Sequence, residues 1–178
     1  PTPYRVWVSE IMLQQTRVEA VKEYYERFMR ALPNVEALAL CEEEKLLKLW
    51  EGLGYYSRAR NLQKAAKEIV ARFDGEFPCQ KEALQRLSGI GSYTAGAIAS
   101  IAFGQKAAAV DGNVFRVASR LEENPSVISD PKYRKYLEEK LSAVYPDTKE
   151  DCSKFTQSLF ELGALVCKPQ TPDCKNCP

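Results

Sequence analysis

The sequence predicts an all-helical protein, and two observations support this prediction. Apolar residues recur every three or four positions along most of the 178-residue chain, as in the segments 18–25, 46–50 and 62–70, and this spacing places them on one face of a helix. Residues that interrupt helices then divide the chain into segments of about 8 to 20 residues, the usual length of globular helices. We therefore expect roughly nine or ten helices.

The predicted interruptions follow one another at fairly even spacing. They lie at 33–34, 52–56, 74–78, 89–91, Gly104, 122–125 and 146–147, where glycine, proline or asparagine disfavours a continuing helix. Ser92, Asp130 and Thr148 stand just before helical patterns, so each is a predicted N-cap whose side chain accepts from a free backbone N–H group. Only the short apolar segment 107–110 resembles a strand.

Composition indicates a compact protein without a membrane segment. Hydrophobic residues make up 45% of the chain and charged residues 28%, a balance that disfavours disorder. The longest apolar stretches, 107–110 and 162–166, are far shorter than the roughly 20 residues that span a bilayer. No secretory signal is visible at the start of the sequence, so a cytoplasmic location is the default expectation.

Charge and histidine content limit the possible functions. Lys and Arg total 25 against 24 Asp and Glu, which gives a net charge of +1, so bulk charge does not favour nucleic-acid binding and any such contact has to be local. The sequence has no histidine, the commonest general base. Carboxylates, tyrosines and cysteines are left to carry any chemistry.

Residues 87–97 read Leu-Ser-Gly-Ile-Gly-Ser-Tyr-Thr-Ala-Gly-Ala, a helix end, a tight turn and the start of a new helix. Gly89 and Gly91 let the backbone turn sharply and approach a phosphate, while N–H groups from Ser92 onward supply donors at the positive end of the helix dipole. The segment resembles a helix-hairpin-helix DNA-binding motif. The alternative is an ordinary tight connection between two packed helices.

Asp111 follows the apolar segment 107–110 and begins the string Asp-Gly-Asn-Val-Phe-Arg-Val. An isolated aspartate before a helix is most simply explained as an N-cap. Its position about twenty residues after the hairpin, however, resembles that of the aspartate in a large superfamily of base-excision glycosylases. This superfamily shares the hairpin and a Gly/Pro-rich loop that ends in aspartate.

Glu10 is the one carboxylate in the string 6–16, Val-Trp-Val-Ser-Glu-Ile-Met-Leu-Gln-Gln-Thr. Helical spacing places Glu10 and Gln14 on the same face. Apolar neighbours raise the pKa of a carboxyl group, so Glu10 is predicted to stay protonated near neutral pH and to serve as a general acid. The alternative is a solvated surface glutamate.

The string 6–16, taken together with residues 50–58, Trp-Glu-Gly-Leu-Gly-Tyr-Tyr-Ser-Arg, is closely similar to the MutY family of adenine DNA glycosylases. The resemblance extends over residues 3–178. It implies an endonuclease III-like fold with two helical lobes. One is a six-helix barrel, residues 16–110, that contains the hairpin at 87–97. The other combines 1–15 with 111–178, and DNA lies in the groove between them.

The resemblance also implies the activity: a monofunctional glycosylase that hydrolyses the N-glycosidic bond of adenine opposite 8-oxoguanine or guanine in double-stranded DNA. Glu10 would protonate adenine at N7, and Asp111 would stabilise the sugar cation. We expect a monomer, cytoplasmic and nucleoid-associated if bacterial, nuclear or mitochondrial if eukaryotic. A C-terminal domain that reads 8-oxoguanine belongs to the family pattern and is absent from this sequence.

Four further residues acquire roles from the same resemblance. Gln15 and Tyr55 match residues that fill the stack vacated by the flipped base, whereas Tyr93 and Asn113 match residues that orient the sugar and the catalytic aspartate. The alternative function is an endonuclease III-like glycosylase and lyase, which forms a Schiff base through a lysine at the position of Tyr93. A phenol cannot form an imine. A noncatalytic hairpin module would not need the two acids.

Three cysteines near the end of the sequence have the spacing Cys-x6-Cys-x2-Cys: Cys167, Cys174 and Cys177. Clustered cysteines indicate a metal site more often than disulfides in a cytosolic protein. The resemblance implies a 4Fe-4S cluster bound by Cys-x6-Cys-x2-Cys-x5-Cys, whose fourth ligand would lie beyond the printed sequence. Zinc and unpaired thiols are the alternatives. The remaining cysteines stand singly and are predicted packing residues: Cys41, Cys79 and Cys152.

Overall fold

The computed structural model describes residues 2–126 and 129–178. Within them are ten α-helices, two π-helical turns, one 3₁₀ turn and no β-strand, so the predicted all-helical class is confirmed. The α-helices are α1 (Pro3–Leu13), α2 (Val18–Ala31), α3 (Val35–Leu40), α4 (Glu43–Trp50), α5 (Ser57–Phe73), α6 (Lys81–Leu84), α7 (Ser92–Ala97), α8 (Gly112–Leu121), α9 (Pro131–Ala143) and α10 (Lys149–Glu161). The π-turns η1 (Ile98–Ala102) and η2 (Leu162–Val166) continue α7 and α10, and η3 (Cys174–Asn176) is the 3₁₀ turn.

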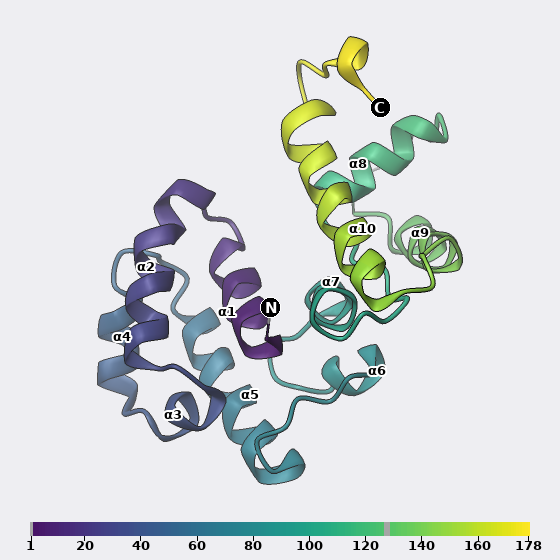
Figure 1. The fold of residues 1–178 in the computed structure, drawn as a ribbon. Helices are drawn as coiled ribbons and strands as arrows, with labels where there is room; N and C mark the ends of the chain where they lie inside the picture. The colour runs from purple at the N-terminus through teal and green to yellow at the C-terminus, as the bar shows by residue number, and fades with distance from the viewer. Residues whose placement is uncertain (1, 127–128) are drawn as a thin grey trace.

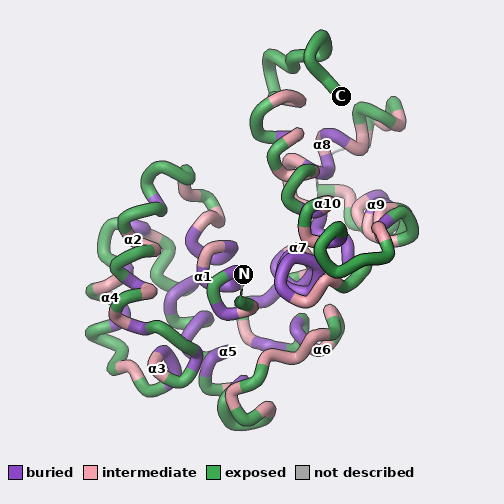
Figure 2. Tube along the Cα trace, viewed as in Figure 1, coloured by how far each residue is buried: buried purple, intermediate pink, exposed green. Residues whose placement is uncertain are grey.

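The helices form two groups, with α1 to α5 on one side and α8 to α10 on the other (Figure 1). The first group encloses a large core in which Trp7, Phe28 and Trp50 are fully buried. The second encloses a smaller core around Phe115 and Leu137. The helix formed by α7 and η1 lies between the groups and is buried on most sides (Figure 2), because η1 packs against both α1 and α10.

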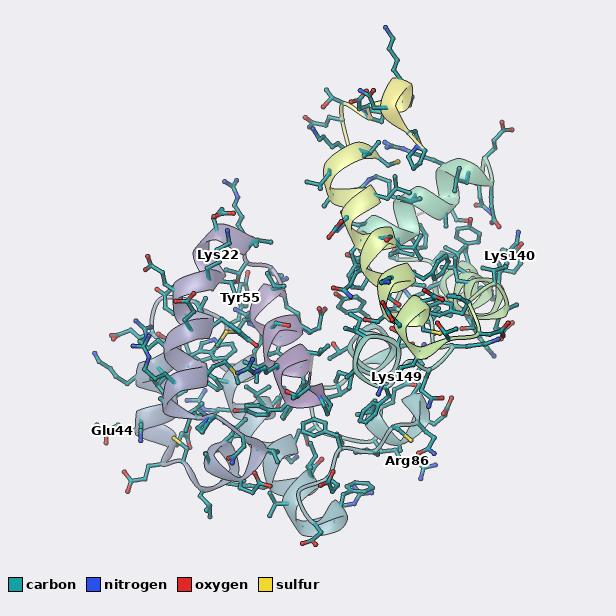
Figure 3. All side chains as sticks on the ribbon, viewed as in Figure 1. Lys22, Glu44, Tyr55, Arg86, Lys140 and Lys149 are labelled. Carbon is teal, nitrogen blue, oxygen red and sulfur yellow. The ribbon has the colours of Figure 1, made fainter. Side chains whose placement is uncertain are left out.

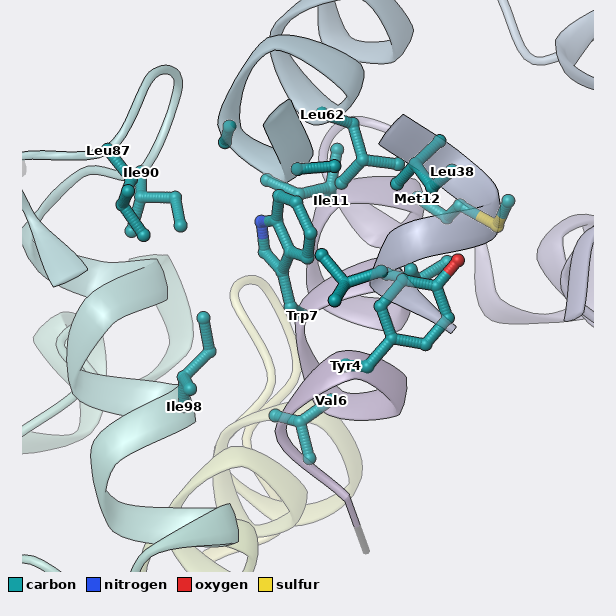
Figure 4. Packing of buried hydrophobic residues seen from close by; sticks show 14 of the residues in the cluster. Tyr4, Val6, Trp7, Ile11, Met12, Leu38, Leu62, Leu87, Ile90 and Ile98 are labelled. Carbon is teal, nitrogen blue, oxygen red and sulfur yellow. The ribbon is translucent and has the colours of Figure 1, made fainter. Parts of the chain in front are cut away.

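Helix α1 belongs to the first core. Trp7 and Met12 extend from α1 into the same apolar cluster as Leu38 (Figure 4). This placement differs from the expected grouping of residues 1–15 with 111–178. The physical reason is that the apolar face of α1 is covered by α2, α5 and α7, so its buried surface is shared with the helices of the expected barrel.

N-capping follows the prediction at three of four helices. The side chain accepts from a backbone N–H group of the first turn at Asp111, Asp130 and Thr148. The prediction for Ser92 is wrong, because Gly91 is the N-cap of α7 and Ser92 is the first helical residue. The Ser92 hydroxyl instead donates to Glu138 Oε2 at 2.7 Å.

Residues 107–110 form no strand, although their side chains alternate. Ala107 and Ala109 belong to the first core, whereas Ala108 and Val110 belong to the second. The segment thus passes between the two cores, and successive side chains point alternately into one core and the other. This alternation produces the strand-like pattern. No second segment pairs with it within the described residues, so no sheet forms.

All predicted interruptions lie outside the helices, and the structure adds further ones at 14–17 and 41–42. Neither contains glycine or proline, which explains why the sequence did not reveal them. The first interruption places Gln15 in a loop directly after α1. In the part of the chain that the structure describes, no helix is long and apolar enough to cross a membrane.

Candidate active site

A cavity of about 550 Å³ lies between the two helix groups, at the C-terminal half of α1. Four predicted site residues line it together, although they come from three separate parts of the sequence: Glu10, Tyr93, Asp111 and Asn113. Apolar side chains of Leu13, Val18, Phe160 and Leu165 form much of the remaining wall. The cavity therefore combines a few polar groups with an apolar lining, as small-molecule and base pockets do.

Glu10 lies on the cavity side of α1 and is only 8% exposed. Burial raises its pKa to about 7, the Tyr93 hydrogen bond opposes this rise, and the nearby charge of Asp111 adds to it. The predicted elevation of the Glu10 pKa is confirmed. A carboxyl group with this pKa is protonated in roughly half of the molecules at neutral pH and is suited to general acid catalysis.

Tyr93 lies in the first turn of α7 and faces Glu10. Its hydroxyl donates a hydrogen bond to Glu10 Oε2. Burial and the neighbouring Glu10 raise the pKa of the phenol well above its usual value, so the group remains a hydroxyl donor. Its ring packs against Phe160 with the centroids 5.8 Å apart, which fixes the direction in which the hydroxyl points.

Asp111 both caps α8 and faces the cavity. Its Oδ1 accepts from the backbone N–H group of Val114 at 2.7 Å, and its Oδ2 accepts from Asn113 Nδ2 at 3.0 Å. Acceptance at both oxygens fixes the side-chain rotamer. The capping role and a chemical role are therefore compatible at this residue.

Arg116 is a site residue that the sequence did not single out. Its Nη2 donates to Asn113 Oδ1 at 2.9 Å and to the Gly163 carbonyl at 2.7 Å, and its Nε donates to the Cys167 carbonyl at 2.9 Å. Asn113 thereby directs its amide nitrogen towards Asp111. A Cβ on Gly163 would lie 2.5 Å from Asn113 Cβ, so this close approach requires glycine. The only feature of the sequence that could have indicated this contact is the i, i+3 spacing of Asn113 and Arg116, which makes them neighbours on a helix.

Gln15 and Tyr55 lie outside the cavity, in the loops 14–17 and 51–56. Both have positive φ angles, 59° for Gln15 and 47° for Tyr55, and such a backbone costs a non-glycine residue on the order of 1 to 3 kcal/mol unless its surroundings hold it in place. Gln15 is exposed, and the Tyr55 side chain is 61% exposed. Figure 3 shows Tyr55 close to the end of α1.

The hairpin between α6 and α7 has the geometry that its glycines predict. Gly89 adopts a φ of 73°, and a Cβ there would lie 2.7 Å from Asn61 Cβ, so only glycine fits. Gly91 is exposed at the start of α7. Because Ser92 uses its hydroxyl on Glu138, the groups that the hairpin offers to a ligand are the backbone N–H groups of the first helical turn.

The three cysteines of the predicted metal motif are not gathered into a ligand set. Among the described residues, no group of three or more His, Cys, Asp or Glu side chains is placed to hold a metal ion. Cys167 Sγ accepts from Arg120 at 3.3 Å, whereas Cys174 and Cys177 are exposed around η3. Among the cysteines predicted as packing residues, Cys152 is buried, and Cys41 and Cys79 are half-buried.

Residues 8–143 match the family model of the HhH-GPD superfamily base excision DNA repair proteins. The chain is 46% identical over 179 residues to the adenine DNA glycosylase of Mus musculus, with 98% of this chain and 34% of that protein covered. It is 41% identical over 177 residues to the adenine DNA glycosylase of Buchnera aphidicola subsp. Baizongia pistaciae, covering 99% and 49%. The chain thus spans about a third to a half of the length of these relatives.

Solved structures with the same fold include a thermostable thymine-DNA glycosylase and a non-covalent endonuclease III–DNA complex. The first has a TM-score of 0.87 and 30% identity, with 99% of this chain and 80% of that chain covered. The second has a TM-score of 0.81 and 27% identity, with 100% and 81% covered. The predicted endonuclease III-like fold is confirmed by this agreement.

Proposed function

This chain belongs to the HhH-GPD superfamily of base excision DNA repair proteins, and we propose that it hydrolyses the N-glycosidic bond of adenine mispaired with 8-oxoguanine or guanine in double-stranded DNA. The observation that carries the proposal is the pair of carboxyl groups at one cavity, Glu10 with a pKa of about 7 and Asp111 accepting at both oxygens. Relatives named adenine DNA glycosylase, 37% to 46% identical, support adenine as the base.

Hydrolysis of this bond requires a neutral leaving base and a stabilised sugar cation, a task for two carboxyl groups as in glycoside hydrolysis. In the proposed reaction Glu10 gives its proton to adenine N7 while the bond from C1′ to N9 breaks and its electron pair moves to the base. The Asp111 carboxylate stabilises the positive charge on the sugar. Water then adds to C1′, and its proton returns to the Glu10 carboxylate or to solvent.

The adenine reaches these groups only after it leaves the base stack, because Glu10 is buried in the wall of the cavity. Extrusion costs a few kcal/mol, which proteins offset by filling the vacated stack and bending the duplex. We assign the filling to Gln15 and Tyr55 and the phosphate contact to the hairpin at Gly89 and Gly91. Tyr93 orients Glu10, and the chain acts as a monomer on its DNA.

The rate of adenine release is expected to fall as the pH rises above about 7, because the reactive form of Glu10 is the protonated one. Well above the pKa, each pH unit lowers the protonated fraction, and with it the rate, about tenfold. Single-turnover reactions with excess protein, from about pH 6 to about pH 9, followed by alkaline cleavage, measure this profile. A rate that stays constant across this range would contradict the role of Glu10 as the acid.

An endonuclease III-like lyase is the second candidate function, because the fold agrees closely with endonuclease III. Tyr93 stands where that reaction needs an amine, and its hydroxyl is engaged with Glu10. We therefore expect borohydride to trap no covalent complex between the protein and its substrate DNA. A trapped complex at the level of a lyase control, visible as a shifted band on a denaturing gel, would favour the lyase.

We also propose that the cysteine segment supplies ligands to a 4Fe-4S cluster. The support is the Cys-x6-Cys-x2-Cys spacing of Cys167, Cys174 and Cys177, while the thiol positions described above do not form a ligand set. No step of the reaction above is assigned to the cluster. Metal analysis of the natural full-length protein is expected to find about four irons per chain, and stoichiometric zinc would refute the assignment.

A further inference from the structure

Arg58 connects the two loops that carry Gln15 and Tyr55. It lies in the first turn of α5 and is only 9% exposed, although no carboxylate is among its hydrogen-bond acceptors. These acceptors are five backbone carbonyls and one hydroxyl, at Ile11, Met12, Gln14, Leu53, Gly54 and Thr16. A buried arginine that bonds mainly to carbonyl groups holds backbone segments in place and does not neutralise a charge.

The guanidinium divides its donors between the loops. Nη1 donates to the Gln14 carbonyl at 2.6 Å and to the carbonyls of Ile11 and Met12 in the last turn of α1 at 2.9 Å and 3.1 Å. Nη2 donates to the carbonyls of Leu53 and Gly54 at 3.1 Å and 3.3 Å. The planar fork of arginine supplies donors in two directions from one rigid group, so a single side chain contacts both loops.

Three of the six acceptors are direct chain neighbours of the two strained residues. Gln14 and Thr16 flank Gln15, and Gly54 precedes Tyr55, and both flanked residues have positive φ angles. The Arg58 guanidinium also lies over the Tyr55 ring, 5.6 Å from its centroid. Strained backbone of this kind persists only where the surroundings hold it, and Arg58 contacts both strained segments.

We propose that Arg58 is a positioning residue that fixes Gln15 and Tyr55 relative to each other, so that both side chains enter the duplex as one unit. The inference rests on the proposed function, in which these two side chains fill the stack left by the extruded adenine. Lysine cannot substitute for arginine here, because an ammonium group donates from one point and cannot reach both loops in the same geometry.

A double-mutant cycle tests the proposal. The duplex carries 2-aminopurine next to the mispaired adenine, since the fluorescence of this base rises when it is unstacked. In the wild-type background, Arg58→Lys is expected to lower the fluorescence rise clearly and the single-turnover rate about tenfold, because misplacement of positioned groups reduces rates steeply. In a background that already carries Gln15→Ala and Tyr55→Ala, the same change is expected to have less than about a twofold effect.

Arg60→Lys provides the matched control on the same helix. Arg60 is exposed and its Nε pairs with Glu43 at 2.7 Å, so its replacement should alter the rate by less than about twofold. If Arg58 only stabilised the fold, Arg58→Lys would reduce activity by the same factor in both backgrounds, and that result would overturn the proposal. If circular dichroism shows that the Arg58→Lys variant is unfolded, Arg58→Gln replaces Arg58→Lys in the cycle.

Two outcomes separate this inference from the proposed function. If the wild-type protein raises the fluorescence but releases no adenine, the proposed function fails, and the cycle measured by fluorescence still tests Arg58. If the wild-type protein binds the duplex and raises no fluorescence, then Gln15 and Tyr55 do not open the stack, and the inference is refuted.

Discussion

Replacing Glu10 with glutamine is expected to lower the single-turnover rate of adenine release by a factor of about 10² to 10⁴, the usual contribution of a general acid. Glutamine keeps the size of the side chain and can still accept the Tyr93 hydrogen bond, but it has no proton to give to N7. Binding of the mispaired duplex should change little, because the loops and the hairpin are untouched. Quantifying the alkali-cleaved strand with excess protein measures the rate.

The same variant should be more stable than the wild-type protein at pH 8. The folded-state pKa of Glu10 is about 7 against an ordinary value of 4.5, so between these two values the folded protein holds a proton that the unfolded chain releases. Stability therefore falls as the pH rises through this window, and above it the buried carboxylate costs on the order of 3 kcal/mol. Glutamine removes this cost, and a higher melting temperature at pH 8 would show it.

These two measurements together separate chemistry from folding. A variant that is inactive and more stable has lost a chemical group, whereas one that is inactive and less stable has lost structure. Glu139→Gln is the matched control, because this glutamate is exposed on α9 and forms only a 3.9 Å contact with Lys135. Equal rates of adenine release by the Glu10→Gln and wild-type proteins would remove Glu10 from the mechanism.

Local patterns in the sequence predicted most of the helices and the chemistry of Glu10. Helical spacing and breaking residues depend only on near neighbours in the chain, so the interruptions that contain glycine or proline were located correctly. The elevated pKa of Glu10 was predicted from its apolar sequence neighbours, but the cavity walls that bury the group also include residues far away in the sequence, such as Phe160. The loop 14–17 was not predicted because its backbone is held in place by Arg58, which lies more than forty residues away in the sequence.

Contacts between distant segments explain the other differences. The alternation of residues 107–110 is real, but it reflects two cores on opposite sides and not a partner strand. Arg116 reaches the Cys167 carbonyl across 51 positions, and no local pattern indicates such an acceptor. Ser92 was a reasonable N-cap by residue type, yet Glu138 on α9 takes its hydroxyl. Residue type predicts what a side chain is able to do, and tertiary packing selects its partner.

The second large effect is expected at Asp111, where asparagine should reduce adenine release by about 10² to 10³ or more, since the loss of one group that stabilises transition-state charge costs about 3 to 4 kcal/mol. Asparagine is as good an N-cap as aspartate, so the bond from Val114 N to Oδ1 survives. Its amide nitrogen cannot accept from Asn113 Nδ2 as Oδ2 does, so the melting temperature should fall slightly. The substitution also removes the negative charge beside the sugar, and the large loss of rate is attributed to that charge.

Asp130 gives a control with the same local chemistry. It caps α9 by accepting from the N–H groups of Lys132 and Tyr133 at 2.9 Å and 3.2 Å, but it does not line the cavity. Asp130→Asn should therefore leave both the rate and the melting temperature nearly unchanged. If Asp111→Asn behaves in the same way, Asp111 serves only as a cap. A loss of activity at Asp111 alone, with both helices intact, attributes the effect to the charge of its carboxylate and not to its position at the start of a helix.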